Sequence, residues 1–324
     1  MDNSMPRYWD LPEASGGGRT AWGLYGSDDS VGRINLLTSQ RVLDAVRLVR
    51  KGTTFALNAA VDEFDPPLDS TRSAARHRYL EVGGDLGVED MDDVLDDYFP
   101  QISSQWDSLA HIAATPGVFY NNVSLDDVKT RGANTIDHLA KRGIVGRGVL
   151  LDVGRAAAQG SGGGVDTSHG SISLSVADLE EARERADVSY SDGCIVLLRT
   201  GFIDWYRKQG IATREELHRD LHAPGIEHTE EMASYLWDSG VAAIASDTFA
   251  VEVWPPDMSE SARPFGLLHR ILIGQLGMPI GELWDLDALA QDCHVDGVYE
   301  FLLVSAPLNI RRGIASPANA IALK

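Results

Sequence analysis

The second half of the chain alternates short, continuously apolar runs with amphipathic segments, and this alternation constrains the fold more than any other feature. The apolar runs lie at residues 147–154, 193–202 and 241–248. Each has the length of a strand, and unbroken apolar character is typical of strands that are covered on both faces. The sequence therefore predicts an α/β protein built in layers, with strands and helices in alternation.

Helices are predicted where apolar side chains recur at helical spacing. At the start of one helix, Ser175 and Asp178 have the spacing of a capping box, and Gly240 marks the end of another. The predicted helices span residues 38–52, 175–186, 229–240 and 266–277, and two further strands are predicted at 53–61 and 299–308.

The domain organisation follows from where this periodicity begins. Residues 1–35 are rich in Gly, Ser and Trp and show little periodicity, so we expect an arm that wraps the body or meets a partner subunit. Residues 36–324 then form a single α/β domain. The Gly-rich segment 160–166 lacks the Lys and Ser or Thr of a phosphate-binding loop, and we expect a flexible loop near the mouth of a site.

The composition excludes several classes of partner. The net charge of −20 disfavours binding to nucleic acids, and the acidic run at residues 89–97 is typical of a solvated surface. No run of 18 apolar residues exists to span a membrane, and the N-terminal segment lacks the pattern of a secretory signal. Two distant cysteines, Cys194 and Cys293, do not suggest a disulfide scaffold. We expect a cytoplasmic protein whose ligand is a small molecule.

The segment 101–111, QISSQWDSLAH, carries the first candidate site residues. Side chains of an extended chain alternate between two faces, so Gln101, Gln105, Asp107 and His111 share one face if the segment is straight. Asp107 is a hard oxygen ligand, His111 is a nitrogen ligand or a general base, and glutamine offers a carbonyl oxygen. The residue types alone leave open a metal site, a catalytic site or a hydrogen-bonded surface strand.

A second pair of candidate ligands lies far downstream. His269 is near the start of the helix predicted at 266–277, and Glu282 follows the helix-breaking residues 277–279. Because these residues turn the chain, Glu282 can return toward His269. Considered alone, the pair is more typical of a histidine on a helix surface and a glutamate in a loop.

Together these segments resemble the metal-dependent cyclase family, which includes bacterial kynurenine formamidases and isatin hydrolases. The family motif His-x-Gly-Thr-His-x-Asp-x-Pro-x-His aligns with residues 101–111. Asp107 and His111 match it, whereas Gln101 and Gln105 replace the two leading histidines. The resemblance is closest to a longer subgroup with an extended N-terminal part. It covers about residues 20–324 and continues through the segments 193–202, 223–248 and 267–289.

The resemblance implies the swivelling β/β/α fold of this family, assembled as a homodimer or homotetramer. Asp107, His269 and Glu282 match the ligands of one ion in the members that bind two metals. Glutamine is a weaker zinc ligand than imidazole, so we expect the other ion to be weakened or lost. The expected cofactor is one divalent ion, Mn²⁺ or Zn²⁺, with Gln105 as a further ligand.

The resemblance also implies a function, because His111 matches the catalytic histidine of the family. The implied activity is a metal-dependent hydrolase that opens a cyclic or aryl amide, or a lactone, with His111 as general acid and base. A cyclase or dehydratase with the same metal site, and a non-catalytic, metal-free member in which His111 only forms hydrogen bonds, are the alternatives. Four residues are predicted to contact the substrate: Gln101, Trp106, Tyr120 and His169.

Overall fold

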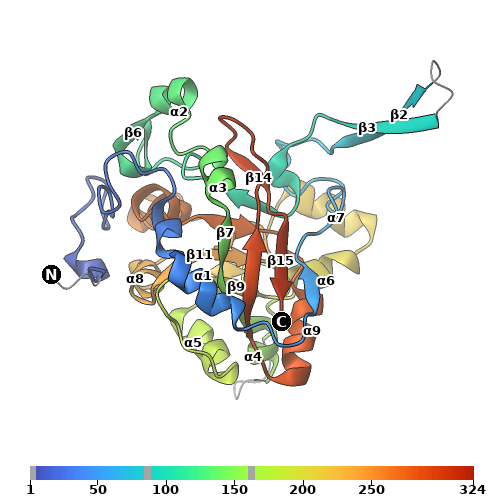
Figure 1. Cartoon of the computed structure of the whole chain (residues 1–324). Coiled ribbons are helices and arrows are strands. Elements are labelled where there is room, and N and C mark those ends of the chain that lie inside the picture. Colours follow the sequence, from blue (N-terminus) through green and yellow to red (C-terminus); the bar gives the residue numbers. More distant parts are fainter. Residues whose placement is uncertain (1–4, 84–88, 160–164) are drawn as a thin grey trace.

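The computed structural model describes residues 5–83, 89–159 and 165–324. The strands of its largest sheet span Thr54–Ala56 (β1), Gln105–Asp107 (β4), Ile144–Asp152 (β7), Cys194–Arg199 (β9), Val241–Ser246 (β11), Ile280–Glu282 (β12), Glu300–Ser305 (β13), Ala315–Pro317 (β14) and Ala320–Leu323 (β15). Within these residues the strand order is β1-β15-β13-β7-β9-β11-β12-β4-β14 (Figure 1). Strands β7, β9, β11 and β12 are parallel, and the remaining strands pair antiparallel.

The central strands are buried on both faces, as their unbroken apolar sequences predict. In β9, Val196 packs into the core on one side of the sheet, whereas Ile195 and Leu197 pack into the core on the other side. The alternation follows from the two-residue period of a strand. The three predicted apolar runs thus form β7, β9 and β11, and the α/β fold class is confirmed.

Helices cover both faces of this sheet (Figure 1). Leu179 of α5 (Val176–Arg185) and Leu236 of α8 (Glu230–Asp238) belong to one core, and Leu139 of α3 (Ile136–Arg142) and Leu289 of α9 (Asp287–Asp296) belong to the other. The predicted capping box forms at the start of α5, where Ser175 and Asp178 satisfy each other's backbone N–H groups.

Two predicted helices differ from the structure. The helix predicted at 38–52 ends at Val46 (α1, Ser39–Val46), because the backbone N–H groups of Lys51 and Thr53 donate to the carbonyl of Lys324 and lead the chain into β1. The helix predicted at 266–277 contains a π-helix, η6 (Arg270–Gln275), in which Leu276 N donates to Ile271 O at 2.8 Å.

The N-terminal segment lies along the body of the same chain. Tyr8 N donates to Asp238 Oδ1 at 2.8 Å, and the indole N–H of Trp22 donates to the carbonyl of Gly274 at 2.9 Å. The acidic run at 89–97 lies largely in β3 (Glu89–Asp96), which pairs with β2 (Arg76–Gly83) in a hairpin that projects from the body (Figure 1).

Two sequence predictions concern a loop and the membrane. Of the Gly-rich loop predicted at 160–166, only residues 165 and 166 are among the described residues. No helix in the described part of the chain is both long and apolar enough to cross a membrane.

The remaining strands and α-helices are β5 (Val118–Phe119), β6 (Val123–Ser124), β8 (Ser173–Leu174), β10 (Gly225–Ile226), α2 (Leu125–Arg131), α4 (Val153–Gln159), α6 (Phe202–Arg207) and α7 (Ile211–Arg219). The 3₁₀ helices are η1 (Tyr8–Asp10), η2 (Gly32–Leu36), η3 (Pro100–Ile102), η4 (Tyr120–Asn122) and η5 (Glu260–Ala262).

Candidate active site

Strand β4 brings Asp107 beside Glu282, although the two residues are far apart in the sequence. Gln105 is opposite Glu282 in the antiparallel ladder with β12, and Gln105 and Asp107 flank Trp106, so they share one face of β4. Both carboxylate oxygens of Asp107 are buried without a hydrogen-bond partner among the described residues. Buried carboxylate oxygens are normally paired, so this site is built to receive a cation or a donor.

Glu252, a buried residue in the loop after β11, orients the third candidate ligand, His269. The ring Nδ1 of His269 donates to the carboxylate of Glu252, which also accepts from the backbone N of His269 at 2.9 Å. His228 Nε2 lies 2.8 Å from the other oxygen of Glu252. Burial acts to raise the pKa of Glu252, but His269 and His228 outweigh it and hold this pKa at about 2. With Nδ1 engaged, His269 presents Nε2 to Glu282 Oε1 at 3.1 Å.

The three residues that match the ligands of one ion in the family therefore meet in space. One ligand atom each of Asp107, His269 and Glu282 lies within 4.8 Å of the others, and all three residues are buried. Two carboxylates and one imidazole form a donor set that suits a divalent ion. The unpaired oxygens of Asp107 fit the same role, because a bound ion would compensate their buried charge.

Gln105 stands at the edge of this group. Its amide N–H donates to Glu282 Oε2, and its carbonyl oxygen has no hydrogen-bond partner among the described residues. The amide thus holds one carboxylate of the triad in place. Its free oxygen is consistent with the predicted role as a further ligand.

His111 approaches the triad through a turn rather than along a strand. The backbone N of His111 donates to Ser108 O at 3.0 Å, and its Nε2 lies 3.9 Å from Asp107 Oδ1. Burial, together with the charge of His269, lowers the pKa of His111 to about 4. Burial and the neighbouring Glu282 raise the pKa of Asp107 well above its ordinary range.

The segment 101–111 is not one straight strand. Only Gln105–Asp107 is extended in the sheet, whereas Gln101 lies in η3 and its carbonyl accepts from Arg72. The expectation of one shared face from Gln101 to His111 is therefore wrong. Before β4, Ser103 Oγ donates to Ala60 O at 2.7 Å and ties the chain to a distant segment. After β4, the local hydrogen bond from His111 N to Ser108 O turns the chain.

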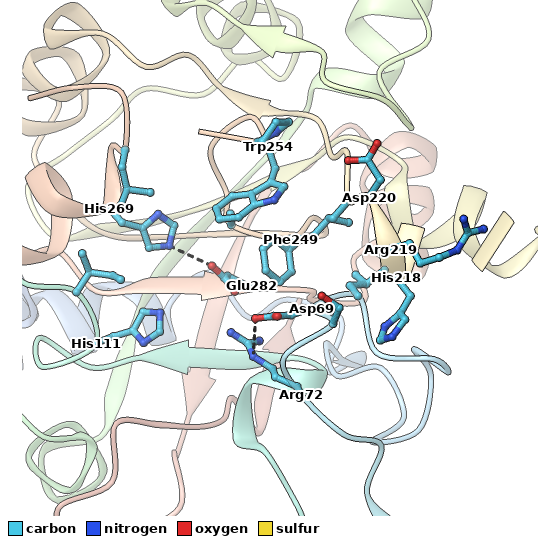
Figure 2. A pocket seen from close by; sticks show the side chains of 17 residues that line it. Asp69, Arg72, His111, His218, Arg219, Asp220, Phe249, Trp254, His269 and Glu282 are labelled. Carbon is cyan, nitrogen blue, oxygen red and sulfur yellow. Dashed lines mark hydrogen bonds and ion pairs between the residues drawn. The ribbon is translucent and has the colours of Figure 1, made fainter. Parts of the chain in front are cut away.

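A cavity of about 470 Å³ borders two residues of the triad, His269 and Glu282 (Figure 2). His111, His269 and Glu282 form part of its lining. Its other walls include Arg72 and the aromatic pair Phe249 and Trp254, whose ring centroids are 5.1 Å apart. Arg72 and Phe249 were not predicted from the sequence. Trp254, in the stretch EVWPP after β11, is one of the aromatic residues that the sequence suggests as a possible pocket lining, together with Trp9, Trp22 and Tyr120.

The four residues predicted to contact the substrate do not line this cavity. Trp106 is fully buried on the opposite face of β4, where its indole N–H donates to Ser305 Oγ at 2.9 Å. Tyr120 is buried too, with its hydroxyl 3.1 Å from Asp29. His169 stacks on Trp205 at a centroid distance of 4.9 Å. Gln101, as described above, belongs to η3.

Comparison with known proteins shows to which family the chain belongs. The family model for cyclases ("Putative cyclase") matches residues 81–253, which is just over half of the chain. The chain belongs to the cyclase family. A search of curated proteins found no significantly similar sequence.

Solved structures of cyclase-family proteins share the whole fold. The structure of a novel cyclase is 28% identical, with a TM-score of 0.82, and the match covers 94% of this chain and 99% of that chain. Isatin hydrolase A from Labrenzia aggregata is 18% identical, with a TM-score of 0.57 and coverage of 88% and 98%. Isatin hydrolase A from Ralstonia solanacearum is also 18% identical, with a TM-score of 0.56, and the match covers 89% of this chain and 98% of that chain. The predicted cyclase-like fold is confirmed.

Proposed function

We propose that this cyclase-family protein is a metal-dependent hydrolase that opens a cyclic or aryl amide, or a lactone. The observation that carries the proposal is the buried meeting of Asp107, His269 and Glu282. The last two of these line a cavity, and both oxygens of Asp107 lack a hydrogen-bond partner among the described residues. A structural ion pair would leave no such unpaired carboxylate. The names of the isatin hydrolases with the same fold are consistent with this class of reaction.

Asp107, His269 and Glu282 would hold the ion, with Gln105 Oε1 as a neutral fourth donor. The donor set favours Mn²⁺ or Zn²⁺. When bound, such an ion supplies Lewis acidity, which polarises a carbonyl group and makes water more acidic. Glu252 fixes the tautomer of His269, so that Nε2 is the nitrogen that faces the site.

His111 would move a proton in this reaction. It lines the cavity, and its Nε2 points toward Asp107 without a direct hydrogen bond at 3.9 Å. A neutral imidazole accepts a proton from attacking water and later donates it to the leaving nitrogen or oxygen. The aromatic wall of Phe249 and Trp254 holds a flat substrate and excludes water from one side of it.

Metal analysis together with two variants tests this proposal. Protein purified without chelator is expected to carry about one equivalent of Mn or Zn, measured by inductively coupled plasma mass spectrometry. Asp107→Asn should lose the ion, because it replaces a charged ligand by a neutral one. His111→Ala should keep the ion and lose about 10²–10⁴-fold in turnover of a panel of cyclic amides, N-formyl anilines and lactones.

His294→Ala is the matched control, because His294 is exposed and remote from the cavity. It should keep both metal and turnover. Protein that binds no ion under any supplementation contradicts the proposal and favours a metal-free member of the family. Normal turnover by His111→Ala contradicts the proton-transfer role alone.

The assembly into a homodimer or homotetramer, which the resemblance implies, also stays a proposal. Sedimentation velocity at micromolar concentration measures it directly. A single species with the mass of one chain, 35.1 kDa, would contradict it.

A further inference from the structure

Arg72 is a cation that is fixed at two points beside the candidate metal site. Its Nε lies 3.2 Å from Asp69 Oδ2, and its Nη1 donates to the carbonyl of Gln101. The side chain is only 15% exposed. Asp69 is itself held by Thr71, whose backbone N donates to it at 2.9 Å. Arg72 is thus pre-organised, and the side chain does not need to be ordered when a ligand binds.

These two contacts leave Nη2 of Arg72 without a partner among the described residues. Figure 2 shows the guanidinium between Asp69 and His111, at the wall of the cavity. Arg72 lines the same cavity as His111, His269 and Glu282. The guanidinium therefore borders the same space as two of the candidate metal ligands.

The remaining walls of the cavity define the shape that such a ligand has. The ring centroid of Phe249 lies 5.8 Å from Arg72 Cζ, and the ring of Trp254 packs edge-on against that of Phe249. Leu68, Leu221 and Leu267 complete an apolar surface. A cavity of about 470 Å³ with one apolar wall and one fixed cation suits a small flat ring that carries an anionic oxygen group.

We propose that the cavity selects a flat, carboxylate-bearing ligand, with its carboxylate on Arg72 and its ring against Phe249 and Trp254. The inference rests on the proposed function, because it identifies the substrate or ring-opened product of that site as an aromatic or similarly flat acid. A guanidinium binds a carboxylate through charge-assisted hydrogen bonds, which are about twice as strong as neutral ones. Arg72 is therefore the residue that determines specificity.

Benzoate and benzamide separate this role from a purely structural one, because they share ring and size and differ in charge. We expect calorimetric titration of the protein as purified to show benzoate bound at least about tenfold more tightly than benzamide. Arg72→Met should weaken benzoate by about 10–100-fold and change benzamide by less than about threefold. Arg72→Lys keeps the charge but cannot make the contacts to Asp69 and Gln101 and still offer a further N–H in the place of Nη2, so it should give an intermediate loss.

Arg219→Met is the matched control, because Arg219 also lines the cavity but is exposed and bonded to its own helix at Glu215 O. It should change benzoate binding by less than about threefold. Equal weakening of both ligands by Arg72→Met would show that Arg72 only supports the fold, and would overturn the inference. A benzoate preference that survives Arg72→Met but disappears after chelation would assign the carboxylate to the metal and overturn it as well.

The titration does not depend on turnover, so the two proposals fail separately. Benzoate binding through Arg72 in a protein that hydrolyses no amide or lactone would keep this inference and contradict the proposed function. Hydrolysis of neutral lactones with unchanged kcat/KM in Arg72→Met, and no preference for benzoate, would keep the proposed function and contradict this inference.

Discussion

At the scale of single residues, Glu252 links the candidate metal site to the body of the protein. It accepts from His269 through both the ring Nδ1 and the backbone N, and its second oxygen lies 2.8 Å from His228. It also accepts from the backbone N of Leu268 at 2.5 Å. One carboxylate thus fixes the position, the tautomer and the ring orientation of the histidine ligand.

Replacing Glu252 by glutamine should lower metal affinity by about 10–100-fold, because a neutral amide holds the Nδ1 proton of His269 less strongly. Competition with a chromogenic chelator measures this affinity. Glu260→Gln, an exposed glutamate in η5, is the control and should leave the affinity unchanged. Full metal affinity in Glu252→Gln would mean that the backbone alone positions His269.

Single residues also show what sequence reasoning could and could not find. Asp107, His269 and Glu282 were found because the family motif and its distal segment are readable from residue type and order. Glu252 and Arg72 were missed, because their roles depend on side chains that meet only in the folded chain. Trp106 was predicted to contact the substrate, but alternation along β4 turns it into the core.

At the scale of elements, the π-helix η6 explains why helical periodicity failed near the site. Apolar spacing predicts an α-helix over 266–277, whereas the backbone widens to i→i+5 bonding immediately after His269. Short π-helical turns are frequent at functional sites. The widened turn brings Gly274 against the backbone of Ala114, three residues after His111.

Gly274→Ala should destabilise the protein by about 1–3 kcal/mol, although alanine has the higher helix propensity. A Cβ at this position would lie 2.6 Å from Ala114 N and 2.7 Å from Ala114 Cα, so one backbone must move. Urea unfolding followed by circular dichroism measures the loss. In Gly210→Ala, the control, the new Cβ meets no atom within 4 Å. If both variants have equal stability, the contact with Ala114 is not tight in solution.

At the scale of the whole molecule, ion binding at the candidate metal site should add to the free energy of unfolding. Three buried acids, Asp107, Glu252 and Glu282, lie at or next to the candidate site, where His228 and His269 contact Glu252 and His269 also contacts Glu282. An ion that binds only the folded state stabilises it by about 2.7 kcal/mol at a free concentration of 100 times Kd.

Addition of Mn²⁺ or Zn²⁺ to chelator-treated protein should therefore raise Tm by several degrees, measured by scanning calorimetry. Asp107→Asn should show no such rise, because its ion site is lost. A Tm that rises equally in both proteins would place the stabilising ion elsewhere on this acidic chain, whose net charge is −20.

The overall architecture was predictable where contacts are local or repeated. The apolar runs identified β7, β9 and β11, since a buried central strand reads as apolar throughout. The order of the strands at the edges was not predictable, because β4, β12 and β14 have only three residues each and carry no periodic signal. Their pairing depends on long-range contacts that no local pattern encodes.

The position of β4 in the sheet has a consequence for how the protein is made. Both neighbours of β4, namely β12 and β14, come from the last part of the chain, and Glu282 itself is on β12. During synthesis from the N-terminus, Asp107 leaves the ribosome long before either partner strand exists. The three candidate ligands can meet only after β12 has emerged, and the strand that carries Asp107 stays unpaired on its other side until Pro317 follows. If the candidate site holds an ion, as proposed, the ion can bind there only late in the life of the nascent chain.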